Sequence, residues 1–154
     1  MYATLIFLHS MVRWLAFGSL VYAVFRGWMG LKDQRTFTKA DNAWRHWTAT
    51  ALHTQLAIGM LLYFQRPITS YFWSHFSEAI QDREMAFFGI WHISLMLVAV
   101  VVATMGSALA KRKTEDAEKF RTMALWFTVA LIILLVAIPW PFSPWVQRPY
   151  IRAF

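Results

Sequence analysis

Four long apolar stretches dominate this sequence and limit what the chain can fold into. They cover residues 2–25, 44–64, 85–110 and 120–138, and hydrophobic residues make up 58% of the 154-residue chain. A helix needs about 20 mostly apolar residues to cross the hydrocarbon core of a bilayer. The sequence therefore predicts an all-α integral membrane protein with four transmembrane helices, forming a single membrane domain over residues 1–154.

The connections between the stretches are short and predict that successive helices run antiparallel. Residues 27–43 and 111–119 join the first and last pairs, and residues 65–84 join the middle pair. Such connections favour an up-down bundle. Within the middle connection, apolar residues recur three or four positions apart: Phe72, Trp73, Phe76 and Ile80. This spacing predicts a short amphipathic helix over residues 69–83 that lies on the membrane surface.

Charged residues are scarce, at 15% of the chain, and their distribution predicts the orientation in the membrane. Ten basic residues lie in or beside the connections on one side: Arg26, Lys32, Arg35, Lys39, Arg45, Lys111, Arg112, Lys113, Lys119 and Arg121. Four lie on the other side: Arg66, Arg83, Arg148 and Arg152. Because basic loops stay in the cytoplasm, we expect a multi-pass protein of a bacterial cytoplasmic membrane with both termini on the periplasmic side. The net charge of +7 then reflects orientation rather than nucleic-acid binding.

Few polar residues inside the predicted spans are available for chemistry. The sequence has no cysteine, which excludes disulfides, iron–sulfur clusters and thiolate zinc sites. Ionisable groups are costly inside a membrane, so each one there is a candidate for function. The candidates are His9, Arg13, His53 and His92, with Gln55 as a neutral companion and His46 near the inner end of the second span.

Depth decides which histidines can meet. His9 and His92 each lie about five residues outward from the middle of their spans, so both are about 7 Å from the midplane. They belong to the first and third helices, which are diagonal in a simple bundle, and two facing imidazoles can ligate one haem iron. His53 lies near the midplane, and His46 is about 10 Å deeper on the same face. A second haem would need a ligand from another subunit, a methionine such as Met105 or Met123, or a helix tilt.

Other residues suit a haem site between these helices. Arg13 is one turn from His9 and can pair with a haem propionate. Ser10, Ser94, Thr54 and Gln55 are candidate hydrogen-bond partners for an imidazole N–H. Glycines in the first three spans let either a macrocycle or a neighbouring helix approach closely: Gly18, Gly59, Gly89 and Gly106.

Two other interpretations remain open at this point. In one, His9, His53 and His92 together bind zinc, copper or non-haem iron, as three imidazoles can. In the other, the protein is a cofactor-free structural subunit of a membrane complex, and its histidines are hydrogen-bonded packing residues. His75, which shares a helical face with Glu78 and Asp82, is expected to be solvated.

The histidine-bearing segments resemble those of small four-helix bacterial membrane cytochromes b. The matching segments are LHSMVRW with His9, ALHTQLAIG with His53 and GIWHISLML with His92, together with DNAWRHWTAT and IPWPFSP. The resemblance implies b-type haem held between histidines of different helices, with electron exchange with quinone or a redox partner. It also leaves open a homodimer or membership of a larger membrane complex. Di-haem members carry a second matched histidine pair, which this chain lacks, so a single haem is favoured.

Overall fold

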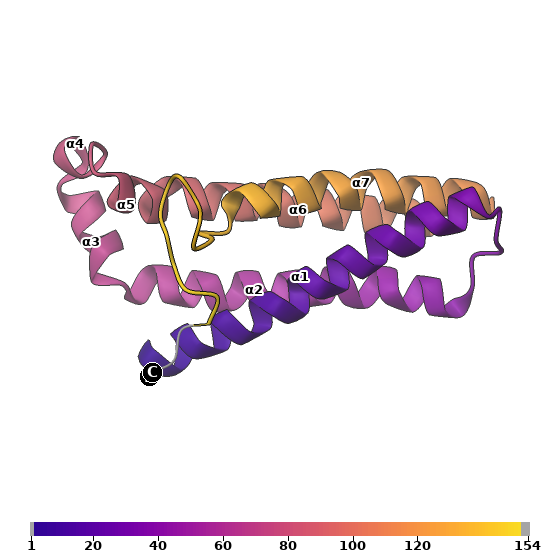
Figure 1. The fold of residues 1–154 in the computed structure, drawn as a ribbon, viewed down its shortest axis with the longest axis horizontal. Coiled ribbons are helices and arrows are strands. Elements are labelled where there is room, and N and C mark those ends of the chain that lie inside the picture. The colour runs from indigo at the N-terminus through magenta and orange to yellow at the C-terminus, as the bar shows by residue number, and fades with distance from the viewer. Residues whose placement is uncertain (1, 152–154) are drawn as a thin grey trace.

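Helices are the regular elements of residues 2–151, the range that the computed structural model describes. Four long helices form the body of the molecule: α1 (Tyr2–Lys32), α2 (Lys39–Gln65), α6 (His92–Arg112) and α7 (Asp116–Ala137). Four short ones lie between α2 and α6: α3 (Pro67–Ser74), α4 (Phe76–Ala79), α5 (Arg83–Ala86) and the π-helix η1 (Phe87–Trp91). The long helices run in alternating directions, and the short ones gather at one end of the bundle (Figure 1).

The long helices pack in a ring in which neighbours in sequence are neighbours in space. Helix α1 packs against α2 and α7, and α6 packs against the same two helices. Helices α1 and α6 are therefore diagonal to one another, as short connections require. This arrangement places His9 of α1 and His92, the first residue of α6, on opposite walls of the bundle.

Three helical segments are long and apolar enough to cross a membrane: Tyr2–Lys32, Arg83–Arg112 and Asp116–Ala137. They correspond to the first, third and fourth predicted spans. Large apolar side chains such as Leu15, Phe25 and Ile132 are more than half exposed on them, which suits contact with lipid better than contact with water. Helix α2 covers the second predicted span but is not among the three. Polar residues occur along it, with Asp41 and Arg45 near its start and His53, Thr54 and Gln55 in its middle.

Small residues let the long helices approach one another closely. A Cβ atom added at Gly30 would lie 2.3 Å from the ring of Phe120, and one at Gly106 would lie 2.2 Å from Cβ of Trp126. The buried core contains many alanines: Ala16, Ala23, Ala99, Ala103, Ala110, Ala124, Ala130 and Ala137. Packing through small residues is typical of helices that associate in lipid, where the hydrophobic effect does not drive helices together.

A buried polar network ties the first two helices together at the end opposite the short helices. Thr38 caps α2, with its backbone N–H and hydroxyl bonded to Oδ2 of Asp41 at 2.9 and 2.5 Å. The other carboxylate oxygen of Asp41 lies 2.6 Å from Nη2 of Arg26 on α1. This capping box explains why α2 begins at Lys39, several residues before its apolar stretch.

We expect the fold to lose stability in acid because of Asp41. Burial raises the pKa of its carboxyl, but hydrogen bonds from Thr38 and the guanidinium of Arg26 outweigh burial and hold the pKa below its ordinary value. A carboxyl of this kind stabilises the fold above its unfolded pKa of about 3.9, and the stabilisation is lost as pH falls through the folded pKa. An acid titration followed by circular dichroism measures this. At neutral pH the Asp41→Asn variant should be less stable than wild type, and as the pH falls it should lose less stability than wild type does. Parallel stability profiles for the two proteins would contradict this.

The predicted amphipathic helix over residues 69–83 is wrong as one continuous element. Helix α3 ends at Ser74, because the next residue, His75, has a φ of −128° and a ψ of 44°, outside the helical region. A single turn, α4, follows, and Asp82 then caps α5 by accepting a hydrogen bond from the backbone N–H of Met85 at 2.8 Å. The apolar side chains do not share one face: Phe72 is buried, whereas Trp73 and Phe76 are exposed.

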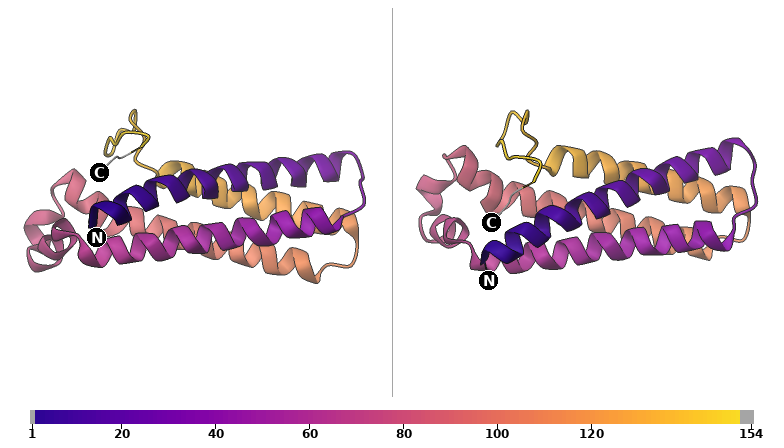
Figure 2. Two further views of the ribbon diagram at one scale, coloured as in Figure 1. Left: turned by 90° about the horizontal axis from the view of Figure 1, so that it is seen from below. Right: turned by 60° about the horizontal axis from the view of Figure 1, so that its bottom comes forward.

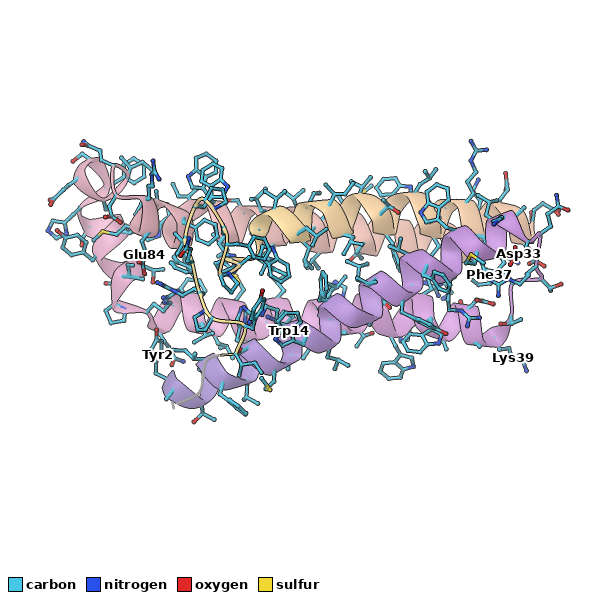
Figure 3. The ribbon with its side chains drawn as sticks, viewed as in Figure 1. Tyr2, Trp14, Asp33, Phe37, Lys39 and Glu84 are labelled. Atoms are coloured by element: carbon cyan, nitrogen blue, oxygen red, sulfur yellow. The ribbon has the colours of Figure 1, made fainter. Side chains whose placement is uncertain are left out.

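Residues 138–151, here called the C-terminal strap, leave the end of α7 and cross the bundle towards α1 (Figures 1 and 2). The strap follows Ala137, where the prolines of IPWPFSP end the helix. Its Trp140 packs against Trp14 and Phe17 of α1, with ring centroids 6.1 and 5.8 Å apart. The indole Nε1 of Trp14 donates to the carbonyl of Tyr150 at 3.0 Å, and Figure 3 shows Trp14 beneath the strap. Arg152 lies outside the described residues.

Candidate functional site

His9 and His92 border the same cavity, at the end of the bundle that carries the short helices. The cavity has about 1270 Å³ of empty space, part of it open to the surroundings. Its walls come from α1, α2, α6, the end of α7 and the strap. Most of the side chains that border it are apolar: Ile6, Leu52, Leu56, Met60, Leu62, Phe88, Ile93, Met96, Val100, Leu134 and Ile138.

The ring of His92 is held by a hydrogen bond to the end of α7. Its Nδ1 lies 2.8 Å from the carbonyl oxygen of Ala137, one of the last carbonyls of a helix, which have no partner within the helix itself. A carbonyl oxygen only accepts, so Nδ1 carries the proton and Nε2 keeps its lone pair in the neutral ring. Metal-ligating histidines are oriented in this way, with one ring nitrogen bound to a carbonyl or carboxylate and the other free to ligate.

The backbone just before His92 is a π-helix, which is rare and frequently found at functional sites. Two groups from other helices hold it. The hydroxyl of Tyr63 donates to the carbonyl of Gly89 at 2.8 Å, and the ring of Phe72 packs so closely that a Cβ at Gly89 would lie 2.6 Å from it. Phe87 packs against the imidazole of His92, with ring centroids 5.6 Å apart. The histidine therefore sits on rigid backbone.

The ring of His9 faces α2 from the opposite wall. The side-chain nitrogen Nε2 of Gln55 lies 3.2 Å from both ring nitrogens and donates to the carbonyl of His9 at 3.0 Å. A Cβ added at Gly59 would lie 3.2 Å from Cε1 of His9, so the glycine leaves room for the ring. The buried Oε1 of Gln55 has no hydrogen-bond partner among residues 2–151. An acceptor without a donor in this wall is compatible with an occupant of the cavity.

Three arginines border the cavity, and none of the residues that line it is a carboxylate. The side chain of Arg13 donates to the carbonyl of Tyr150 and lies 3.5 Å from the hydroxyl of Ser10. The guanidinium of Arg66 lies over the ring of Phe88, 4.3 Å from its centroid, and that of Arg148 lies 5.2 Å from the same centroid. Glu84, outside the cavity, forms an ion pair with Arg148. This end of the site is strongly cationic.

The sequence indicated Arg13 as a site residue but missed Arg66 and Arg148. Both were counted only as basic residues of the outer side, where Arg66 directly follows the last residue of α2. The sequence did contain one signal for Arg66: it lies at the end of the second span and directly before Pro67, a position from which a side chain can reach the end of the bundle. Arg148 has no such signal, because it belongs to the non-helical strap and reaches the cavity only through tertiary contacts.

The remaining histidines lie elsewhere. His53 is exposed, with Nε2 3.1 Å from the hydroxyl of Thr104 on α6, and it does not border the cavity. His46 is exposed beside Trp47, and His75 is exposed and stacked on Tyr71. Within residues 2–151, no three or more side chains of His, Cys, Asp and Glu are grouped so as to hold a metal ion. The structure thus brings His9 and His92 to one cavity and leaves His53 and His46 apart from them.

The predicted partners of the imidazoles also divide into two groups. Ser10 and Gln55 border the cavity, whereas Thr54 and Ser94 are exposed, and the hydroxyl of Thr54 donates to the carbonyl of Thr50 at 3.0 Å. Among the glycines, Gly59 borders the cavity, while Gly106 packs against Trp126 of α7.

No family model, no curated protein and no solved structure matches this chain. The class of protein therefore follows from fold and composition. It is an all-helical protein with three helices long and apolar enough to span a membrane. Its distinguishing site is a cavity bordered by two histidines and three arginines at one end of the bundle.

Proposed function

We propose that this protein is a membrane electron-transfer protein that holds a single b-type haem between His9 and His92. The observation that carries the proposal is the pair of imidazoles on diagonal helices, facing one cavity, with the Nδ1 of His92 bound to Ala137. Helix-bundle cores are a common place for such sites. The chemistry that haem supplies when bound is one-electron transfer at its iron.

The other residues of the cavity fit a haem. The apolar walls suit the macrocycle, and the guanidiniums of Arg13 and Arg66 suit the two propionates, since guanidinium binds carboxylates well. In this arrangement His9 and His92 bind the iron, Gln55 holds the ring of His9, and the packed helices exclude water.

The proposal places α2 across the membrane as a fourth span. Helix α2 runs beside α1 and α6 along the bundle (Figure 1). Its charged residues, Lys39, Asp41 and Arg45, lie in its first turns. Asp41 is paired with Arg26, and Arg45 donates to Asn42 and Ser107. The remaining length, residues 46–65, has no charged residue other than titratable histidine. The basic connections then face the cytoplasm of a bacterial cell, and the cavity opens near the periplasmic side.

An absorbance spectrum tests this function directly. The protein is purified in detergent from cells supplied with iron and a haem precursor, and oxidised and reduced spectra are compared. We expect a Soret band and the sharp reduced bands of a six-coordinate b-type haem, at a stoichiometry of one haem per chain. Protein that is folded but free of haem, or that carries stoichiometric zinc or copper instead, would overturn the proposal. Reduction by a quinol analogue would identify quinone as an electron partner, and reduction only by a redox protein would exclude it.

A further inference from the structure

The charges at the mouth of the cavity do not balance. Of the three arginines that border it, Arg148 has the carboxylate of Glu84 as its counter-charge. The guanidinium of Arg13 contacts neutral groups: the carbonyl of Tyr150, the hydroxyl of Ser10 and the ring of Trp14. The guanidinium of Arg66 lies on an aromatic face and has no ion pair among residues 2–151. Among residues 2–151, neither of these two positive charges has a carboxylate partner, an arrangement that costs free energy in a membrane cavity unless an anion joins them.

We infer that Arg66 and Arg13 form an anion-recognition site that binds the carboxylate or phosphate group of an amphiphile whose apolar body fills the cavity. Haem, with its carboxylates, is one amphiphile of this kind, and an anionic lipid is another. The two arginines would recognise the acidic group of either ligand, so the anion site does not depend on the bound amphiphile being haem.

The geometry of the two guanidiniums suits this role. Arg66 lies 4.3 Å from the ring centroid of Phe88, and a guanidinium held against an aromatic face keeps its in-plane N–H donors available for another partner. The Nε of Arg13 is buried and has no hydrogen-bond partner among the described residues. Guanidinium donors bind carboxylate and phosphate oxygens in pairs, more strongly than they bind neutral acceptors. The site thus offers guanidinium donors for an anion from two residues that border the same cavity.

The rest of the cavity sets the requirement for an apolar body. Side chains from three helices make up its interior, including Ile6 of α1, Leu56 and Met60 of α2, and Ile93 and Met96 of α6. Apart from the arginines, the hydrogen-bonding side chains that border it are those of His9, Ser10, Gln55, Tyr63, Thr69 and His92. A small hydrophilic anion would leave these walls without contacts. The combination selects a ligand that is apolar along its length and acidic at one end.

The test compares acidic ligands with neutral analogues of the same shape. Ferric haem and its dimethyl ester are titrated into protein stripped of haem, using wild type, Arg66→Gln, Arg66→Lys and the control Arg83→Gln. Arg83 is an exposed arginine on the same side that does not border the cavity. We expect wild type to prefer the acid over the ester by about tenfold or more, as one charge-assisted pair implies. Arg66→Gln should lose most of this preference with unchanged ester affinity, while Arg66→Lys keeps part of it and Arg83→Gln keeps all of it.

A second arm uses lipid and remains informative if haem does not bind at all. Native mass spectrometry of the protein with phosphatidylglycerol or phosphatidylcholine measures retention of each lipid. If neither form of haem binds, the proposed function fails, and selective retention of phosphatidylglycerol that Arg66→Gln abolishes still supports the anion site. Equal binding of acidic and neutral ligands by wild type in both arms would overturn the inference. Circular dichroism of each variant establishes that a lost preference does not come from unfolding.

Discussion

Replacing His92 by alanine should remove the haem absorbance of the purified protein, and replacing His9 should do the same. Under the proposed function, each variant removes one of the two histidines that would bind the haem iron, and these are the histidines that border the cavity. Neither His53 nor His46 borders the cavity, so neither is placed to supply a substitute imidazole. We expect each variant to lose the Soret band at equal protein concentration. If one variant has a weaker effect than the other, we expect it to retain a five-coordinate haem that is easily lost.

His53→Ala and His46→Ala are the matched controls for this experiment. Both residues are histidines of α2, both are exposed, and neither borders the cavity. Their variants should keep the wild-type spectrum and haem stoichiometry. Loss of haem in His53→Ala, or an unchanged spectrum in His92→Ala, would show that the iron is held elsewhere.

Replacing Gly106 by alanine should destabilise the bundle far more than replacing Gly18. A Cβ at Gly106 would lie 2.2 Å from Cβ of Trp126 and 2.9 Å from its Cγ, whereas a Cβ at Gly18 would meet nothing within 4 Å. The Cβ of Trp126 moves with its backbone, so relief requires separating α6 from α7. Overpacking of this kind costs about 1–3 kcal/mol or more, which corresponds to a drop of about 2–12 °C in Tm for a protein of this size.

Gly18→Ala should leave Tm unchanged or raise it slightly, since alanine is favoured over glycine in helix interiors by about 1 kcal/mol. Thermal unfolding in one detergent, followed by circular dichroism, measures both variants. Equal Tm values for the two would contradict the close packing of α6 on α7. Gly106→Ala should also keep its haem below Tm, because Gly106 does not border the cavity.

Hydropathy located the helical cores of this fold but not the ends of the helices. Helix α2 begins at Lys39 because Thr38 and Asp41 form a capping box, and that signal is polar. The break at His75 was missed for a different reason. Amphipathic spacing reports which side chains share a face, and it is insensitive to a single residue that leaves the helical region.

Depth along the helix and diagonal placement were sufficient to predict that His9 and His92 would share a cavity. Both quantities follow from span boundaries and the order of helices, which short loops fix. Rotation of each helix about its axis was not predictable in this way, and Thr54 and Ser94 accordingly lie on exposed faces. The position of Arg148 at the cavity could not be predicted from the sequence. It depends on the path of a segment without periodicity and on the ion pair with Glu84.

The C-terminal strap gives the cavity a wall that can open while the helices stay packed. Its polar attachments are side-chain contacts: Arg13 and Trp14 to the carbonyl of Tyr150, and Arg148 to Glu84. Releasing them breaks no hydrogen bond of a helix backbone, so strap opening is a local event with a lower free energy than global unfolding. We therefore expect the strap, rather than the melting temperature of the bundle, to set the residence time of any occupant. Hydrogen exchange should therefore be faster at the strap amides than at those of α1 and α6, and an occupant in contact with the strap should slow it.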